Sequence, residues 1–407
     1  MSSASVDTGV ARPSALGVTF TSPLYRGATV ALFLAGLGMS AAAPQIALFL
    51  VNDLHVSLTT AGLYYLANLT APVAGYLVGA RSDRTGRRLG LFRLCALAGF
   101  LGWLGIAFST QAWMPFVISA VVLAFAGAGG SQLFAAIHDD LQADRVPVGE
   151  EVVSIVRMAL TAGWIIGPVA GSFLAAAIGP RAMLVATALC TLAQIIPMGF
   201  LNSPRPPAVA MSAAAAAHVV RRRGLRVMLP LLAFTGLYVL VYAGEPIKYA
   251  YLPIYMHDDL RLPGVVSGAV IGIQPLVELL LMPLAVVVAR RIGAMRLMVL
   301  GAAFGVGANL CFALTGNLVG MFAGQLLMGG VWGVFAALGI IVAQRLLPDA
   351  VATASAIFMS STAIASALGG LTGGVGVAVL GLPLVFLGPA LFGLVATVGI
   401  MVMSRTR

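Results

Sequence analysis

The chain has 407 residues, of which 60% are hydrophobic and only 9% are charged. Soluble domains are about 25% charged, so a soluble fold could not cover its surface with this composition. High hydrophobicity also excludes a disordered chain, and three dispersed cysteines exclude a disulfide-rich secreted fold, which leaves a protein that crosses a membrane many times.

A helix needs about 20 apolar residues to cross a hydrocarbon core roughly 30 Å thick. Twelve successive stretches meet this requirement and predict membrane-spanning helices: 27–50, 58–80, 89–109, 112–137, 151–178, 181–201, 227–255, 263–290, 294–314, 317–344, 349–378 and 381–403. No segments with the alternating pattern of membrane β-strands occur, so we expect an all-α membrane protein.

The basic residues are distributed unevenly between the two sides of this arrangement. Of the 23 basic residues, 19 lie at the termini or in loops on one side, whereas only Arg181 and Arg261 lie on the other. Cytoplasmic loops of membrane proteins are enriched in arginine and lysine. We therefore expect both termini in the cytoplasm and the chain in the plasma membrane. Because topology accounts for the net charge of +10, no nucleic-acid partner is expected.

The longest cytoplasmic connection divides the spans into two groups of six. The predicted units are a tail, a six-helix half, a linker, a second six-helix half and a short tail: 1–26, 27–201, 202–226, 227–403 and 404–407. The halves repeat weakly at an offset of 206 residues, so that Asp53-Leu54 matches Asp259-Leu260 and Gly62 matches Gly268. Two parallel repeats of six spans are typical of the major facilitator fold.

The loop after the second span carries a polar motif that resembles the signature of major facilitator transporters, Gly-x-x-x-Asp-Arg-x-Gly-Arg-Arg. The matching residues are Gly79, Asp83, Arg84, Gly86, Arg87 and Arg88. A basic cluster that merely stops translocation would need the arginines, but neither Asp83 nor the glycines. Gly86 permits a tight turn. The resemblance implies that Asp83 holds a charged latch against neighbouring helix ends in one transport state.

The fifth span contains Gly163, Gly167 and Gly171, with Pro168 beside the middle glycine. Glycines four residues apart create a smooth helix face that another helix can approach closely. This face could serve ordinary packing alone. It also resembles the Gly-x-x-x-Gly-Pro-x-x-Gly element of exporters in the superfamily, which favours efflux over uptake.

Several further segments resemble the bacterial sugar efflux transporters over most of the chain. They are 48–56, 81–83, 131–135, Arg157, 164–168, 252–255, Glu278 and 325–327. The resemblance implies a proton-linked exporter of simple sugars, glycosides and sugar analogues. The chain departs from the family pattern at Glu245 and Lys248, which place charges where familiar members carry neutral residues.

Four ionisable residues lie inside the predicted spans: Arg157, Glu245, Lys248 and Glu278. Charges within a bilayer are costly and mark functional sites. Burial favours the neutral form of a carboxylic acid, so Glu278 is the first candidate for the proton carrier. It could instead form a structural pair with Arg157 or Lys248. Glu245 and Lys248 are three residues apart and could neutralise each other on one helix face.

Sugar recognition uses amides for hydroxyl groups and aromatic faces for the C–H side of the ring. The candidates for substrate binding are Gln45, Asn68, Gln132, Trp164, Gln274, Gln325 and Tyr242. Some of these will instead form contacts between helices. The sequence His-Asp-Asp-Leu occurs at 138–141 and at 257–260, on opposite predicted sides, so both are interpreted as polar helix ends. No metal or other cofactor is expected.

These observations favour a secondary active transporter, acting as a monomer, that exports sugars or glycosides in exchange for protons by alternating access. A proton-coupled multidrug exporter of the same superfamily is the alternative, although 119–130 in the fourth span lacks the charge of familiar drug–proton antiporters. A membrane-embedded enzyme or a non-transporting receptor is more remote, because the sequence contains no hydrolase, metalloprotease or phosphate-loop motif.

Overall fold

A computed structural model describes residues 14–143, 148–199, 201–202 and 225–405. These residues form helices and no strands. Eleven segments within them are long and apolar enough to cross a membrane. The predicted span 58–80 is helical but is not among the eleven. It is divided into α4 (Leu58–Leu63), the 3₁₀ segment η2 (Tyr64–Thr70) and α5 (Ala71–Thr85). The predicted all-α membrane fold is confirmed.

The first bundle extends from the amino-terminal helix to the end of the sixth span. Besides α4, η2 and α5, it contains α1 (Ala15–Thr21), α2 (Pro23–Ala42), α3 (Gln45–Leu48), η1 (Phe49–Asp53), α6 (Arg88–Ala107), α7 (Trp113–Ile118), η3 (Ser119–Leu123), α8 (Ala124–Ala126), α9 (Gly129–Ala143), α10 (Gly149–Ile178), α11 (Pro180–Ala193) and η4 (Ile196–Met198). Helix α10 packs along α2, and α11 packs against both α2 and α6.

The second bundle contains the remaining helices. They are α13 (Leu225–Tyr242), α14 (Gly244–Ile254), η5 (Tyr255–Asp259), α15 (Gly264–Ile292), α16 (Ala294–Leu314), α17 (Leu318–Leu346), η6 (Pro348–Ala350), α18 (Val351–Leu380), η7 (Leu384–Phe386) and α19 (Leu387–Arg405). Helix α17 packs against α15 and α16, and its buried face includes Gln325 and Trp332.

The exporter-type glycines hold α10 against α2 within the first bundle. A Cβ atom at Gly163 would lie 2.6 Å from the backbone nitrogen of Leu37. At Gly167 it would lie 2.6 Å from the Leu37 backbone oxygen and would overlap Ser40 Oγ. The predicted smooth face is therefore present, and it contacts a helix of the same bundle.

A different row of glycines joins the two bundles. Helix α15 presents Gly264, Gly268 and Gly272 to α10. A Cβ atom at Gly268 would lie 2.7 Å from the backbone oxygen of Pro168, which leaves no space for a side chain. On the other side of the molecule, α18 packs against α4 and η2. A Cβ atom at Gly374 would lie 2.9 Å from the backbone oxygen of Thr59.

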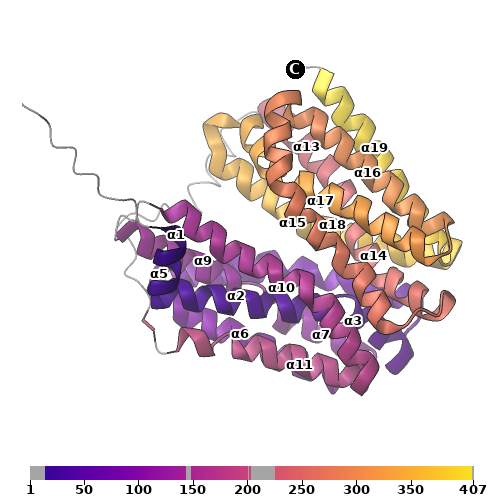
Figure 1. Cartoon of the computed structure of the whole chain (residues 1–407), viewed down its shortest axis with the longest axis horizontal. Coiled ribbons are helices and arrows are strands. Elements are labelled where there is room, and N and C mark those ends of the chain that lie inside the picture. The colour runs from indigo at the N-terminus through magenta and orange to yellow at the C-terminus, as the bar shows by residue number, and fades with distance from the viewer. Residues whose placement is uncertain (1–13, 144–147, 200, 203–224, 406–407) are drawn as a thin grey trace, which may run out of the picture.

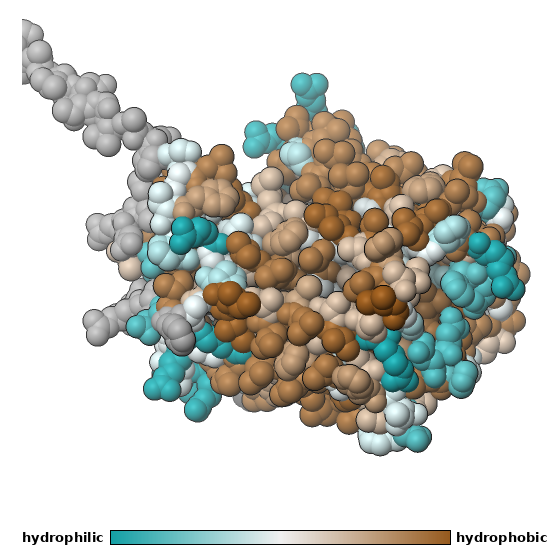
Figure 2. Space-filling model, turned by 60° about the horizontal axis from the view of Figure 1, so that its bottom comes forward, coloured by the Kyte–Doolittle hydropathy of each residue, from teal (hydrophilic) through white to brown (hydrophobic). Residues whose placement is uncertain are grey.

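The bundles meet at one end of the molecule and diverge toward the end that carries α1 and the carboxyl terminus (Figure 1). Asn68 Nδ2 donates to Ser366 Oγ across the contact at 2.7 Å, and Tyr251 Oη donates to the Leu58 backbone oxygen at 3.2 Å. Hydrophobic residues cover the middle of the face shown in Figure 2, and hydrophilic residues gather toward its ends. The end where the bundles meet is called the closed end below.

The internal repeat is visible in backbone geometry at the closed end. The first span of each bundle finishes in a π-helical turn, η1 or η5, and these turns lie 206 residues apart. His55 and Arg261, at the same offset, are the non-glycine residues with positive φ in the described chain, at 53° and 52°. Such values are uncommon outside glycine. The weak sequence repeat therefore corresponds to a repeated turn.

Part of the predicted cytoplasmic side lies outside the described residues. This applies to residues 203–224 of the linker and to Arg12, Arg145, Arg205, Arg221, Arg222, Arg223 and Arg407.

Candidate functional site

A buried polar cluster joins three helices of the second bundle. Lys248 Nζ on α14 lies 2.7 Å from Glu245 Oε2 and also donates to Gln274 Oε1 on α15. Trp332 Nε1 on α17 donates to Glu245 Oε1 at 2.5 Å. Gln274 Nε2 approaches the same oxygen at 3.4 Å. The pairing expected from the i, i+3 spacing of Glu245 and Lys248 is therefore present.

Both members of this ion pair are removed from solvent. Glu245 is 7% exposed and Lys248 is 1% exposed. A buried charge that loses its partner costs about 3–5 kcal/mol, whereas a matched buried pair costs little relative to an apolar replacement. The pair also occupies the carbonyl oxygen of Gln274 and the indole nitrogen of Trp332. These two side chains are therefore fixed by the pair.

Glu278 follows Gln274 by one turn of α15 and has a different environment. It is partly buried, and no hydrogen bond or ion pair joins it to any other residue that the structure describes. It interacts electrostatically with Glu245 and Lys248. The alternative that Glu278 forms a structural pair with Arg157 or Lys248 is not seen here. Of the two acids in this site, Glu245 therefore has direct hydrogen-bond and ion-pair partners, and Glu278 has none among the described residues.

A cluster of aromatic rings packs beside the polar cluster. Tyr242 and Trp332 meet edge to face with ring centroids 5.0 Å apart, and Tyr238 stacks on Tyr242 at 6.0 Å. Tyr238 also contacts Phe358 of α18 at 4.5 Å. An apolar wall with a few polar groups is the usual construction of a small-molecule site.

Arg157 lies apart from this cluster. Its side chain is exposed on α10, and its guanidinium carbon lies 5.7 Å from the ring centroid of Phe134 on α9. No acid in the described part of the chain forms an ion pair with Arg157. Arg157 therefore stands as a fixed cation on the first bundle.

The predicted sugar-binding residues do not form one set. Gln274 belongs to the polar cluster and Tyr242 packs beside it on Trp332, whereas Gln45 Nε2 donates to Ser172 Oγ at 2.9 Å near the closed end. Asn68 bridges the two bundles through Ser366. The others lie elsewhere along the spans. Trp164 is partly buried on α10, Gln132 is buried on α9, and Gln325 is fully buried on α17 with neither amide atom hydrogen-bonded.

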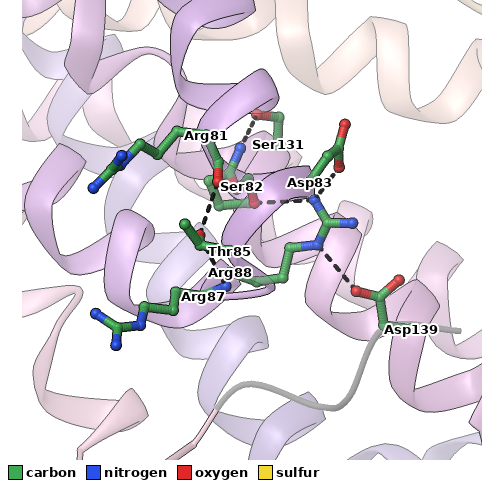
Figure 3. A network of polar contacts seen from close by, with 9 residues as sticks. Arg81, Ser82, Asp83, Thr85, Arg87, Arg88, Ser131 and Asp139 are labelled. Carbon is green, nitrogen blue, oxygen red and sulfur yellow. Dashed lines mark hydrogen bonds and ion pairs between the residues drawn. The ribbon is translucent and has the colours of Figure 1, made fainter. Parts of the chain in front are cut away.

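The predicted gating motif forms a network inside the first bundle (Figure 3). Arg88 Nη1 lies 2.6 Å from Asp83 Oδ1 and donates to Ser82 Oγ at 2.9 Å. Arg88 Nε lies 3.0 Å from Asp139 Oδ2 on α9. The Asp83 side chain remains 55% exposed, so it is available to a further partner. Gly86 ends α5 with φ 64°, which is the turn expected of it.

The other motif residues contribute little to this network. Arg84 and Arg87 are exposed, and a Cβ atom at Gly79 would meet nothing within 4 Å. Sequence reasoning missed Asp139, which was interpreted as part of a polar helix end. Its spacing in the sequence could have indicated a buried position. Gln132, Ala136 and Asp139 follow each other at intervals of four and three residues, and all three lie on the buried face of α9. A carboxylate on such a face requires a partner, which Arg88 provides.

The sequence is similar to a large family of transporters over most of its length. A sequence profile of the Major Facilitator Superfamily matches residues 28–336. Sugar efflux transporter A of Dickeya chrysanthemi is 27% identical over 352 residues, covering 85% of this chain and 87% of that protein. Sugar efflux transporter B of Salmonella typhimurium is 24% identical over 374 residues, covering 90% of each.

Solved structures of low sequence identity share the fold. The crystal structure of the nucleoside transporter NupG is 15% identical, with a TM-score of 0.77, and covers 94% of this chain and 98% of that one. A D-xylose-proton symporter is 16% identical, with a TM-score of 0.68, covering 92% and 96%. The profile match spans most of the chain and agrees with the twofold bundle architecture. The protein therefore belongs to the Major Facilitator Superfamily and is a multi-pass membrane transporter, not an enzyme.

Proposed function

We propose that the protein exports sugars or glycosides in exchange for protons. The substrate class is supported by the relatives named sugar efflux transporters, whose similarity covers most of both chains. The aromatic wall of Tyr238, Tyr242 and Trp332 fits this class, because sugar rings pack their C–H faces on aromatic side chains.

The observation that carries proton coupling is the contrast between the two acids of the cluster. Lys248, Gln274 and Trp332 all contact the Glu245 carboxylate directly. Glu278 has no hydrogen-bond or ion-pair partner in the described chain, so we assign proton uptake and release to its carboxyl group. In this proposal Glu278 carries the proton, the Glu245–Lys248 pair positions the site, and Arg157 is a fixed charge on the facing bundle.

Alternating access supplies the transport step in this proposal. The bundles rock so that the closed end opens when the opposite end closes. Asp83, which is exposed in the present state, would find a partner at the approaching helix ends of the second bundle. The glycine row of α15 is the contact that must separate when the closed end opens.

The proposal also specifies how the chain is oriented in the membrane and how it is divided into two halves. We place both termini in the cytoplasm and the protein in the bacterial inner membrane, because the basic residues concentrate on that side. The halves are 27–201 and 227–403, joined by the linker 202–226, and the protein acts as a monomer. The closed end then faces outward.

Transport by purified protein in proteoliposomes tests this function. An imposed pH gradient should drive uphill movement of a labelled sugar, and collapse of the gradient with a protonophore should stop it. A panel of monosaccharides, disaccharides and aryl glycosides, beside amphiphilic cations, identifies the cargo class. Movement of the cations without any of the sugars would contradict the proposal.

A further inference from the structure

A pocket of about 410 Å³ lies between the bundles at the closed end. Its walls come from both halves of the chain. Gln45, Asn52 and Ser172 belong to the first bundle, and His257 and Ser267 belong to the second. The volume falls within the range of small-molecule sites, roughly 300–1,000 Å³. The pocket is separate from the polar cluster around Glu245 and Glu278, whose residues do not line it.

A tight helix crossing bounds one side of the pocket. Immediately beyond Ser267, a Cβ atom at Gly268 would lie 2.7 Å from the Pro168 backbone oxygen. One turn further, a Cβ atom at Gly272 would lie 3.2 Å from the Ile165 backbone oxygen. No ligand can pass between α10 and α15 at such distances. Asn52 and His257, which line the pocket at the closed end, are exposed, so the pocket opens on the side that the proposed orientation places outside the cell.

The polar groups of the pocket are mostly neutral donors and acceptors. Ser267 is 9% exposed, and its buried hydroxyl oxygen has no hydrogen-bond partner among the residues that the structure describes. Gln45 is 7% exposed and uses Nε2 to bind Ser172, which leaves its carbonyl oxygen for a ligand. Asn52 is exposed.

The two titratable side chains on the wall already have partners. Asp53 Oδ1 lies 3.6 Å from Arg181 Nε, and His257 Nδ1 lies 2.6 Å from Asp258 Oδ1. Amides and hydroxyls without a free charge match a neutral ligand that has several hydroxyl groups.

We propose that this pocket is an outer regulatory site that binds a neutral polyhydroxylated molecule and holds the closed end shut. The ligand contacts both walls, so it binds when the walls are together and not when they separate. Such a ligand shifts the equilibrium between the two transport states toward the state in which the closed end is shut, and the shift grows as more of the pocket is occupied. If the proposed function holds, the exported sugar is itself such a molecule. Accumulated product outside the cell then slows further export.

The test measures efflux of a labelled sugar from preloaded proteoliposomes while unlabelled sugar is added outside. Wild-type efflux should fall by about twofold or more as the outer site fills. Ser267→Leu places a larger side chain in the pocket, and Asn52→Ala removes an amide from its wall. Both variants should keep the efflux measured without external sugar and lose the inhibition. Gln111→Ala, which removes an exposed amide outside the pocket in the α6–α7 connection, should behave like the wild type.

A binding measurement separates this inference from the function on which it rests. Sugar that binds to the outer site should raise the melting temperature of the detergent-purified wild type. Ser267→Leu should reduce this rise in melting temperature. Absence of sugar efflux in every preparation would overturn the proposed function and leave this shift as the test of the pocket. Inhibition that persists unchanged in both Ser267→Leu and Asn52→Ala would overturn the outer site, because the central site then explains it.

Discussion

Lys248 Nζ lies 2.7 Å from Glu245 Oε2, and both side chains are buried in the second bundle. The same lysine reaches Gln274, and the same glutamate accepts from Trp332. One ion pair therefore connects α14, α15 and α17. Because Glu245 is neutralised in this way, Glu278 is left as the acid of the site without a bonded partner in the described chain.

Removal of one member of this pair should be far more harmful than removal of both. Lys248→Met leaves a buried carboxylate without its cation and should lower the free energy of unfolding by about 3–5 kcal/mol. Glu245→Gln leaves the lysine unpaired, with a loss of similar size. The double variant Glu245→Gln/Lys248→Met should recover most of the stability. Thermal unfolding in detergent measures all three, and additive losses in the double variant would show that the pair is not coupled.

The two glycine rows should respond differently to a bulky substitution. Gly167 contacts α2 within its own bundle, so Gly167→Leu should reduce the yield of folded protein as well as efflux. Gly268 contacts α10 across the bundle interface, so Gly268→Leu should leave each bundle folded and keep the closed end open.

Cysteine labelling reports this difference. In a background without the three native cysteines, Ser172→Cys should react faster with an external thiol reagent when Gly268→Leu is present. Equal labelling with and without Gly268→Leu would mean that this glycine row does not hold the closed end together.

The gating network should control turnover more than folding. Asp83→Asn removes one partner of Arg88 but leaves Asp139 in place, so the protein should insert normally and transport more slowly. Asp139→Asn removes the buried partner and should also lower stability by about 1–3 kcal/mol. Initial transport rates at matched protein levels provide the comparison. Normal turnover of Asp83→Asn would argue against this loop as a gate.

The aromatic wall should bind substrate through its ring faces. Tyr242→Ala removes a ring that contacts Tyr238 and Trp332, and the half-saturating sugar concentration should rise about tenfold, which corresponds to roughly 1.4 kcal/mol. Tyr242→Phe keeps the ring and should have a much smaller effect. Transport kinetics distinguish the two variants, and equal effects would assign the contribution to the hydroxyl group instead.

Local spacing along the chain predicted several features of the structure. The i, i+3 spacing of Glu245 and Lys248 placed them together on one face, and Gly86 marked the turn after the second span. In both cases the relevant atoms lie within one or two helical turns, where helix geometry determines which residues meet. The offset of 206 residues predicted two related halves, and the structure adds that each half has a turn at the matching position, His55 and Arg261.

Contacts between helices could not be predicted in this way. The glycine spacing of α10 indicated a close neighbour but not that the neighbour is α2. The amide oxygen of Gln274 is occupied by Lys248 because α14 and α15 pack together, and no local pattern encodes that contact. The partner of Asp139 could not be predicted for the same reason, since Arg88 is 51 residues away along the chain. The interruption at Tyr64–Thr70 was also not foreseen.

The central claim is that Glu278 carries the exchanged proton, and sugar accumulation in inverted membrane vesicles tests it most directly. An inside-acid pH gradient should drive uptake of labelled sugar by the wild type. Glu278→Gln imitates the protonated acid, so it should retain counterflow of sugar in the same vesicles and lose the pH-driven accumulation. Full accumulation by Glu278→Gln would contradict the account and would make Glu245 the better candidate for the proton carrier.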